Sequence, residues 1–295
     1  MAIDYIYNMD LKLPFGLKEG KLVEVSEVER GLPCGCICPA CSHRLVARKG
    51  DKTIHHFAHY KSAECKGALE TALHMAAKET LEKSKGFRLP KVYGYIGHSW
   101  GSRGYILHEE QTIEFDKVFL EKRLDNLVPD IILELNGRQL FVEIAVTHFI
   151  DEAKRRKIKE LGISTIQIHL KEIDRQISFT ELENILLNDT ILKEWVYNRK
   201  AQQFNDRIRA LGREHKVIKG QFGNISGKIY QCPLIGKKWK DKTAASLTED
   251  CFECRYFFSS RSGDELNSNT HILCIGHAEK ELRSIISKYK RIRSQ

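Results

Sequence analysis

Two carboxylates, Asp130 and Glu143, lie on the two arms of a predicted hairpin. The loop between them contains Asn136-Gly137, the strongest short signal for a two-residue β turn. With those two residues as the loop, Asp130 and Glu143 become direct cross-strand partners, about 5 Å apart at Cβ. Such like charges repel, so a proton, a basic neighbour or a hard divalent cation must offset them. The alternative is an exposed edge strand whose two acids are solvated by water.

The segments around this hairpin predict the elements that would position the two acids. Strand alternation puts the acids on one face with Ala145 and Thr147, opposite an apolar face. That apolar face consists of Ile131, Leu133, Leu135, Leu140, Val142, Ile144 and Val146. A strand at 112–124 precedes the hairpin, and a helix and a strand at 163–170 follow it. Together with a helix at 68–86, this order predicts a mixed sheet with helices packed on it.

The two predicted helices carry further candidates. Glu70, His74 and Lys78 recur every four residues along the border of the first helix's apolar stripe, where side chains reach from a packed helix into a cleft. Ordinary solvated pairs at this spacing are the alternative. In the second helix, Lys154 and Lys157 fall within the apolar stripe. A lysine aimed at the carboxylates would supply the offsetting charge, and Lys154 is the first choice, ahead of Lys157 and Lys78.

The nine cysteines form two clusters, at 34–65 and 232–274. Their clustering, odd number and C-x-x-C pairs indicate zinc sites rather than a disulfide framework. The predicted ligands in the first cluster are Cys38, Cys41, His56 and His59, with Cys65 as the alternative. Three further side chains are within reach: Cys34, Cys36 and His55. The competing interpretation is a reduced, cysteine-rich loop with core histidines.

The second cluster also offers more ligands than a tetrahedral zinc needs. The predicted set is Cys232, Cys251, Cys254 and Cys274, with His277 as the alternative. A segment of roughly 60 residues, such as the one that contains this cluster, buries too little apolar surface to be stable without a covalent or metal crosslink. We therefore expect two structural zinc ions in the chain, one at each cluster.

Composition narrows the class of protein and its partners. The chain has 295 residues, 42% of them hydrophobic, and a formal charge of +9 with a pI of about 9.0. This charge favours a polyanionic partner such as nucleic acid. No stretch approaches the ~20 apolar residues of a membrane span, and no secretory signal is evident, so we expect a cytoplasmic protein. A homo-oligomer or a protein partner is left open.

Together these motifs resemble a known family. Pro129-Asp130 followed by Glu143 is similar to the PD-(D/E)XK (restriction endonuclease-like) nuclease core. The order of C-x-x-C, His56-Phe-Ala-His59, a further cysteine and E-T-x-L-H-x-x-x-K resembles the competence protein CoiA-like family over roughly residues 31–170. The resemblance implies that Asp130 and Glu143 hold Mg²⁺ or Mn²⁺ and that Glu70 and His74 join them. The family lysine two residues after the second acid is replaced by Ala145, which leaves Lys154 as its candidate substitute.

The predicted function is a metal-dependent nuclease that hydrolyses phosphodiester bonds, in DNA rather than RNA because the resembled family is associated with DNA. DNA processing and anti-phage defence are both compatible biological roles. The alternative is a zinc-dependent nucleic-acid-binding protein with a degenerate, inactive nuclease fold, and a protein-interaction scaffold is a weaker third interpretation. The predicted domains are a zinc module (1–66), the nuclease core (67–175), a helical connector (176–220) and a zinc-ribbon-like module with a basic tail (221–295).

Overall fold

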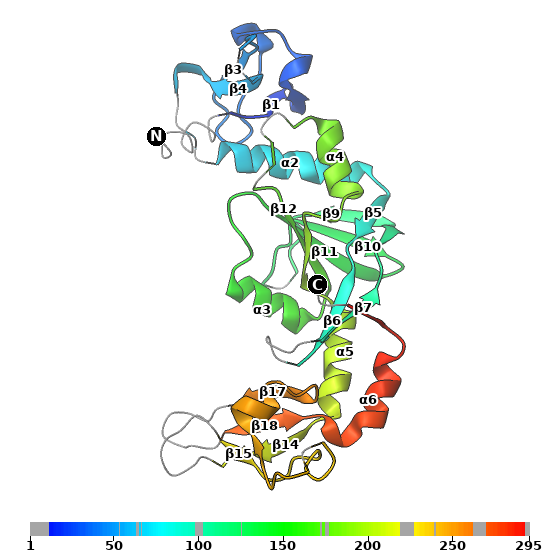
Figure 1. Cartoon of the computed structure of the whole chain (residues 1–295). Helices are drawn as coiled ribbons and strands as arrows, with labels where there is room; N and C mark the ends of the chain where they lie inside the picture. Colours follow the sequence, from blue (N-terminus) through cyan, green and yellow to red (C-terminus); the bar gives the residue numbers. More distant parts are fainter. Residues whose placement is uncertain are drawn as a thin grey trace. The chain divides into compact units, whose positions relative to one another are not determined.

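The chain forms two compact units in the computed structural model (Figure 1). The described residues are 12–52, 54–62, 65, 67–97, 103–124, 126–171, 173–174, 177–218, 227–238, 240–261 and 270–292. Unit 1 consists of Met1–Pro90 and Glu110–Asn198, and unit 2 consists of Lys91–Glu109 and Arg199–Gln295. The second unit is therefore discontinuous, because its first segment is inserted in the sequence of the first unit.

Unit 1 is built on a five-stranded sheet with the strand order β13-β12-β11-β10-β9. The strands are β9 Lys117–Leu120, β10 Ile131–Leu135, β11 Arg138–Ala145, β12 Thr165–His169 and β13 Lys193–Tyr197. β11 and β12 are parallel, whereas the other neighbours are antiparallel. The predicted mixed sheet is therefore confirmed.

The hairpin of β10 and β11 has the register that its turn residues predict. Leu135 pairs with Arg138, which leaves Asn136 and Gly137 as the loop. Their φ angles are 48° and 71°. A two-residue turn with positive φ at both positions matches the twist of the flanking strands, and Asn and Gly adopt it at the lowest cost.

Helices cover both faces of this sheet (Figure 1). α2 Ala68–Lys83 and α4 Phe179–Leu187 pack on one face, and α3 Glu152–Leu161 packs on the other. The α2 face belongs to the larger core, which includes Leu73, Leu81, Ile131 and Val142. The α3 face is a smaller core of Leu127, Ile132, Phe141, Ile158 and Val196. Alternate residues of β10 and β11 thus enter different cores, as strand alternation requires.

The N-terminal strands share the larger core with α2 and the sheet. They are β1 Phe15–Lys18, β2 Lys21–Glu24, β3 Leu45–Arg48 and β4 His56–His59, paired as two hairpins. Short 3-10 turns at Val25–Glu27 and Leu32–Cys34 lie between β2 and β3, and a third at Tyr60–Ser62 follows β4. A further pair, β5 Gly86–Leu89 and β8 Gln111–Glu114, follows α2. Phe15 and Phe57 are fully buried in this core, so the N-terminal segment does not stand apart from the sheet.

Unit 2 contains two three-stranded sheets. The first has the order β19-β7-β6, with β6 Val92–Ile96, β7 Arg103–His108 and β19 Lys290–Arg291. The second has the order β14-β18-β17, with β14 Arg213–Lys216, β17 Phe257–Arg261 and β18 His271–Cys274. The remaining elements are α5 Arg199–Ala210, β15 Lys228–Ile229, β16 Ala245–Ser246, a π-helical turn at Leu247–Cys251, a 3-10 turn at Gly276–Ala278 and α6 Glu279–Ile286. No helix in the described ranges is both long and apolar enough to cross a membrane.

Two predicted elements differ in the structure. The segment 176–220, expected to be a helical connector, contains β13 between α4 and α5 and β14 after α5. β13 pairs with β12 and completes the central sheet, so tertiary pairing overrides the helical pattern there. The expected strand at 112–124 is two strands, β8 and β9, which pair with β5 and β10 respectively. These partners lie too far along the chain for a local pattern to indicate the break.

A buried lysine on β13 gives unit 1 a titratable core group. Lys193 is 6% exposed. Its ammonium donates to the carbonyl of Arg88 at 2.8 Å and lies 3.9 Å from the ring centroid of Phe87. Burial lowers the pKa of Lys193 from 10.5 to about 7, although Asp189 opposes the shift.

We predict that Lys193→Met removes a pH-dependent part of the stability. Between pH of about 7 and 10.5 the unfolded chain holds a proton that folded Lys193 lacks. The free energy of unfolding therefore rises with pH across this window, by a few kcal/mol, and this gain is lost as pH falls to 7. Urea unfolding of both proteins across the window measures it, with the exposed Lys85→Met as the control. A wild-type slope that persists in Lys193→Met would contradict the prediction.

Candidate functional site

The two acids of the hairpin lie side by side at one end of the sheet. Asp130 immediately precedes β10, and the pairing of Ile131 with Val142 puts it opposite Glu143. An oxygen of Asp130 accepts a hydrogen bond from the backbone N–H of Ile144 at 2.8 Å, which fixes its orientation. Glu143 is only 3% exposed, and its Oε1 has no hydrogen-bond partner among the described residues. A buried carboxylate oxygen without a partner is costly unless a proton or a cation binds it.

The environment of Glu143 favours its protonated form. Burial is the largest cause, and the negative charge of Asp130 adds to it, so the pKa of Glu143 rises from 4.5 to about 7. Lys154 opposes the shift, with its ammonium 2.5 Å from Glu143 Oε2. The carboxyl group thus changes charge near neutral pH. A positive charge bound at Oε1 would hold it ionised.

The lysine ranked first from the sequence is the one that the structure brings to the acids. Asp151 caps α3 by accepting from the backbone N–H of Lys154 at 2.6 Å, so the helix begins with this lysine in its first turn. The other two candidates lie elsewhere. Lys157 donates to the carbonyl of Asn126 at 3.2 Å, and Lys78 pairs with Glu121 at 2.5 Å.

The strip of polar residues on α2 faces the same end of the sheet. His74 Nδ1 is 3.8 Å from Asp130 Oδ1, and its buried Nε2 has no hydrogen-bond partner among the described residues. Glu70 accepts a hydrogen bond from the hydroxyl of Thr147 and lies 3.6 Å from Nδ1 of His148. The structure therefore brings Glu70, His74, Asp130, Glu143 and Lys154 together from α2, the hairpin and α3.

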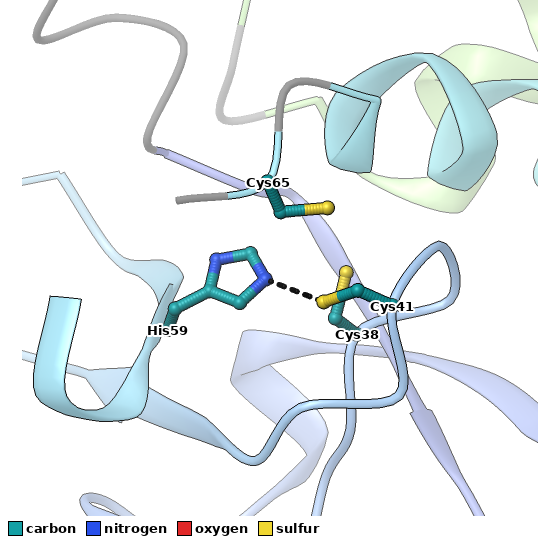
Figure 2. A group of neighbouring side chains, drawn as sticks. All are labelled: Cys38, Cys41, His59 and Cys65. Carbon is teal, nitrogen blue, oxygen red and sulfur yellow. Dashed lines mark hydrogen bonds between the residues drawn. The ribbon is translucent and has the colours of Figure 1, made fainter. Parts of the chain in front are cut away.

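A second group of side chains, Cys38, Cys41, His59 and Cys65, has the composition of a metal site (Figure 2). One ligand atom from each lies within 4.8 Å of the others. Sγ of Cys41 is 3.3 Å from Nε2 of His59. Cys38 and Cys41 flank a tight turn in which the N–H of Ala40 points at the Cys38 sulfur, 3.4 Å away. Three thiols and an imidazole form a donor set that suits tetrahedral zinc.

His56, one of the four ligands predicted for this group, is replaced by the alternative ligand Cys65. His56 and His59 are three residues apart in β4, and such residues point to opposite faces of a strand. Nδ1 of His56 instead lies 2.6 Å from the carbonyl of Ile54. Cys34 and Cys36 are also outside the group, where their thiols donate to the carbonyls of Leu45 and Cys34.

The four C-terminal cysteines line one small cavity in unit 2, together with His215. The cysteines come from three segments, since Cys251 and Cys254 form one C-x-x-C pair and Cys232 and Cys274 lie on either side of it in the sequence. Burial, together with the negative charges of the other three cysteines and Asp250, raises the pKa of the Cys251 thiol to about 12. Among the residues that the structure describes, only the N-terminal group has ligand atoms within 4.8 Å of one another, so the C-terminal thiols are more widely spaced.

His277, the alternative ligand of this cluster, faces another histidine. Its Nε2 lies 2.9 Å from Nε2 of His215, and the two rings are stacked. His215 is a side chain that sequence reasoning missed. It is buried on β14, and only its place in a short alternating strand, Arg213–Lys216, could have indicated an inward orientation.

Comparison with known proteins gives one match. Residues 27–68 match the family model for the N-terminal domain of competence protein CoiA. No curated protein and no solved structure matches the chain. The matched segment contains all four residues of the N-terminal Cys/His group and ends at the first residue of α2. It supports a CoiA-like family for this chain, and it stops before Glu70.

We predict that the N-terminal group binds zinc through Cys65 and not through His56. Cys41→Ala should lower the zinc content by about one ion per chain, because it removes one of four ligands. His56→Ala is the matched control and should retain the zinc. Elemental analysis after dialysis against a chelator measures both. Zinc loss in His56→Ala equal to that in Cys41→Ala would contradict this ligand set.

Proposed function

We propose that unit 1 is a metal-dependent nuclease, because a CoiA-like N-terminal segment precedes a site that contains two carboxylates and a lysine. The observation that carries the proposal is the buried Glu143 paired with the half-buried Asp130, with Lys154 2.5 Å from one oxygen of Glu143 and no partner at the other among the described residues. The family match suggests a role connected with competence. Within that broader role, we propose that the chain hydrolyses phosphodiester bonds.

The residues present fit a hard divalent cation. Carboxylate oxygens are the ligands that Mg²⁺ prefers, and Oε1 of Glu143 has no partner among the described residues, while Asp130 lies close enough for its charge to raise the pKa of Glu143. Asp130 and Glu143 would hold Mg²⁺ or Mn²⁺. When bound, such an ion polarises the phosphodiester and lowers the pKa of a water ligand.

The remaining side chains have roles that do not require the ion. Lys154 would place positive charge next to the developing negative charge of the phosphate, as the family lysine does from the position of Ala145. Ala145 lies on the Glu143 face of β11 and is buried, so a helix-borne lysine approaches over a small side chain. His74 and Glu70 would exchange protons with water or substrate.

DNA is the proposed substrate rather than RNA, through the CoiA-like resemblance, with DNA processing or anti-phage defence as the biological setting. A degenerate, non-catalytic nucleic-acid-binding protein is the second candidate. The specific observation in its favour is the ion pair of Lys154 and Glu143, which offsets the buried charge without any metal. The two candidates differ in whether phosphodiester bonds are broken.

Cleavage of plasmid and single-stranded DNA, with and without Mg²⁺ or Mn²⁺, tests the proposal. Glu143→Gln and Lys154→Ala should each lower the rate by about 100-fold or more, since the first weakens a metal ligand and the second removes the positive charge next to the phosphate. Lys157→Ala, one turn away on α3, is the matched control and should cleave like the wild type. Full activity in Glu143→Gln would reject the site, and no metal-dependent cleavage by the wild type would favour the non-catalytic candidate.

We also propose that the C-terminal cysteines hold a second structural zinc ion. The observation behind it is the shared cavity of Cys232, Cys251, Cys254 and Cys274. In addition, the N–H of Gly276 points at the Cys274 sulfur, 3.4 Å away, as the N–H of Ala40 does at Cys38. Backbone N–H groups directed at sulfur stabilise a thiolate.

Cys251→Ser should therefore remove about one further zinc ion per chain and lower the thermal stability of unit 2. His277→Ala tests the alternative ligand and should retain the ion, because His277 faces His215 instead. Elemental analysis and thermal unfolding measure the two effects. Unchanged zinc in Cys251→Ser would rule out the site.

A further inference from the structure

The basic charge of the chain is concentrated in unit 2. Its two segments contain 22 lysines and arginines but 11 aspartates and glutamates, a net charge of +11. Unit 1, which carries the proposed catalytic site, has 26 basic and 28 acidic residues, a net charge of −2. Affinity for a polyanion is therefore expected from unit 2.

Unit 2 also exposes two neighbouring aromatic rings. Tyr93 and Tyr95 lie on the same face of β6 and are 40% and 52% exposed. Their ring centroids are 6.4 Å apart. Large aromatic side chains are usually buried unless they contact a partner, so an exposed pair indicates a binding surface.

The register of the three-stranded sheet defines this surface as two rows of residues. Tyr93 pairs with Ile106 on β7, and Ile106 pairs with the exposed Lys290 on β19. Tyr95 pairs with Gly104. A Cβ at Gly104 would lie 2.6 Å from the Ile292 side chain and 3.2 Å from a ring carbon of Tyr95, so the glycine leaves room for both side chains to lie against the sheet. We call this face, with Tyr93, Tyr95, Gly104, Ile106 and Lys290, the tyrosine face.

The opposite face of the same sheet packs against α5, which restricts the movement of the sheet. Gly94 lies against Phe204 of α5, where a Cβ would come within 2.6 Å of the ring. Tyr105 is buried, and its ring centroid is 6.2 Å from that of Phe204. Helix α5 thus supports the sheet from behind, and the tyrosine face is presented on a rigid scaffold.

We propose that the tyrosine face binds single-stranded nucleic acid by stacking bases on Tyr93 and Tyr95, with Lys290 beside a phosphate. Exposed rings on a sheet, next to a basic strand in a positively charged unit, are the combination that binds single strands. Stacking on the tyrosines requires an unpaired base, so a duplex would bind only through electrostatic attraction between its phosphates and the basic side chains. The proposal builds on the proposed function, because it names the form of substrate, but binding can be measured without cleavage.

The test is fluorescence anisotropy of labelled oligonucleotides with the full chain, in EDTA at low salt. Tyr93→Leu and Tyr95→Leu should each weaken binding of single-stranded DNA by about tenfold. Tyr95→Phe keeps the ring and should bind like the wild type. Lys290→Ala should reduce the slope of log affinity against log salt by about 0.7. Tyr230→Ala, at another exposed tyrosine of unit 2, is the control and should not change binding.

Parallel titrations with an RNA oligonucleotide and a DNA duplex of the same sequence distinguish the polymers. Weaker duplex binding that is insensitive to the tyrosine substitutions would support stacking. Equal binding by Tyr93→Leu, Tyr95→Leu and wild type, with unchanged thermal unfolding, would overturn the proposal. A loss in Tyr95→Phe as large as in Tyr95→Leu would also overturn it, since the ring would not be the contact. Binding is measured in EDTA, where the proposed metal-dependent cleavage does not occur, so this result is independent of catalysis.

Discussion

The structure of unit 1 depends on keeping a buried carboxylate, Glu143, on the central strand of its sheet. Lys154 offsets part of the cost of this burial with its ammonium 2.5 Å from Oε2, whereas the negative charge of Asp130 adds to it. Asp130 is itself held by the backbone N–H of Ile144 and lies 3.8 Å from His74 of α2. A side chain 3% exposed with one oxygen unpartnered among the described residues would not be favoured by packing alone. Such a site is stable only if the rest of the fold already holds its partners in place.

The N-terminal Cys/His group contributes to that preorganisation through chain connectivity. Cys65 is three residues before the start of α2, and α2 carries Glu70 and His74. A metal ion at Cys38, Cys41, His59 and Cys65 would fix the approach to the helix and hence the position of both side chains. This provides a physical reason for a zinc segment to precede an acidic site in one polypeptide. The shared core of the N-terminal strands, α2 and the sheet points the same way.

Local signals predicted the parts of this fold that short-range chemistry determines. Asn136-Gly137 defined the hairpin register, and that register put Asp130 opposite Glu143. Helical spacing put Lys154 and Lys157 in the apolar stripe, and the structure places the first-ranked of them, Lys154, at Glu143. The missed parts depend on distant partners. β13 forms because β12 offers an open edge, and His56 points away because β4 is a strand, not a turn. The tyrosine face needed the pairing of β6, β7 and β19, which no local pattern shows.

The insertion of β6 and β7 into the sequence of unit 1 has a consequence for dissecting the chain. A fragment that ends at Asn198 keeps this hairpin but loses β19 and α5. Within the described residues, β19 is the hairpin's only other sheet neighbour and α5 is the helix that packs on it. Tyr105 and the β6 glycine would then face water instead of Phe204. Such a fragment carries a β-hairpin with an unpaired edge and exposed apolar surface, which favours self-association. Because unit 2 is discontinuous in the sequence, truncation at a single point cannot yield either unit intact.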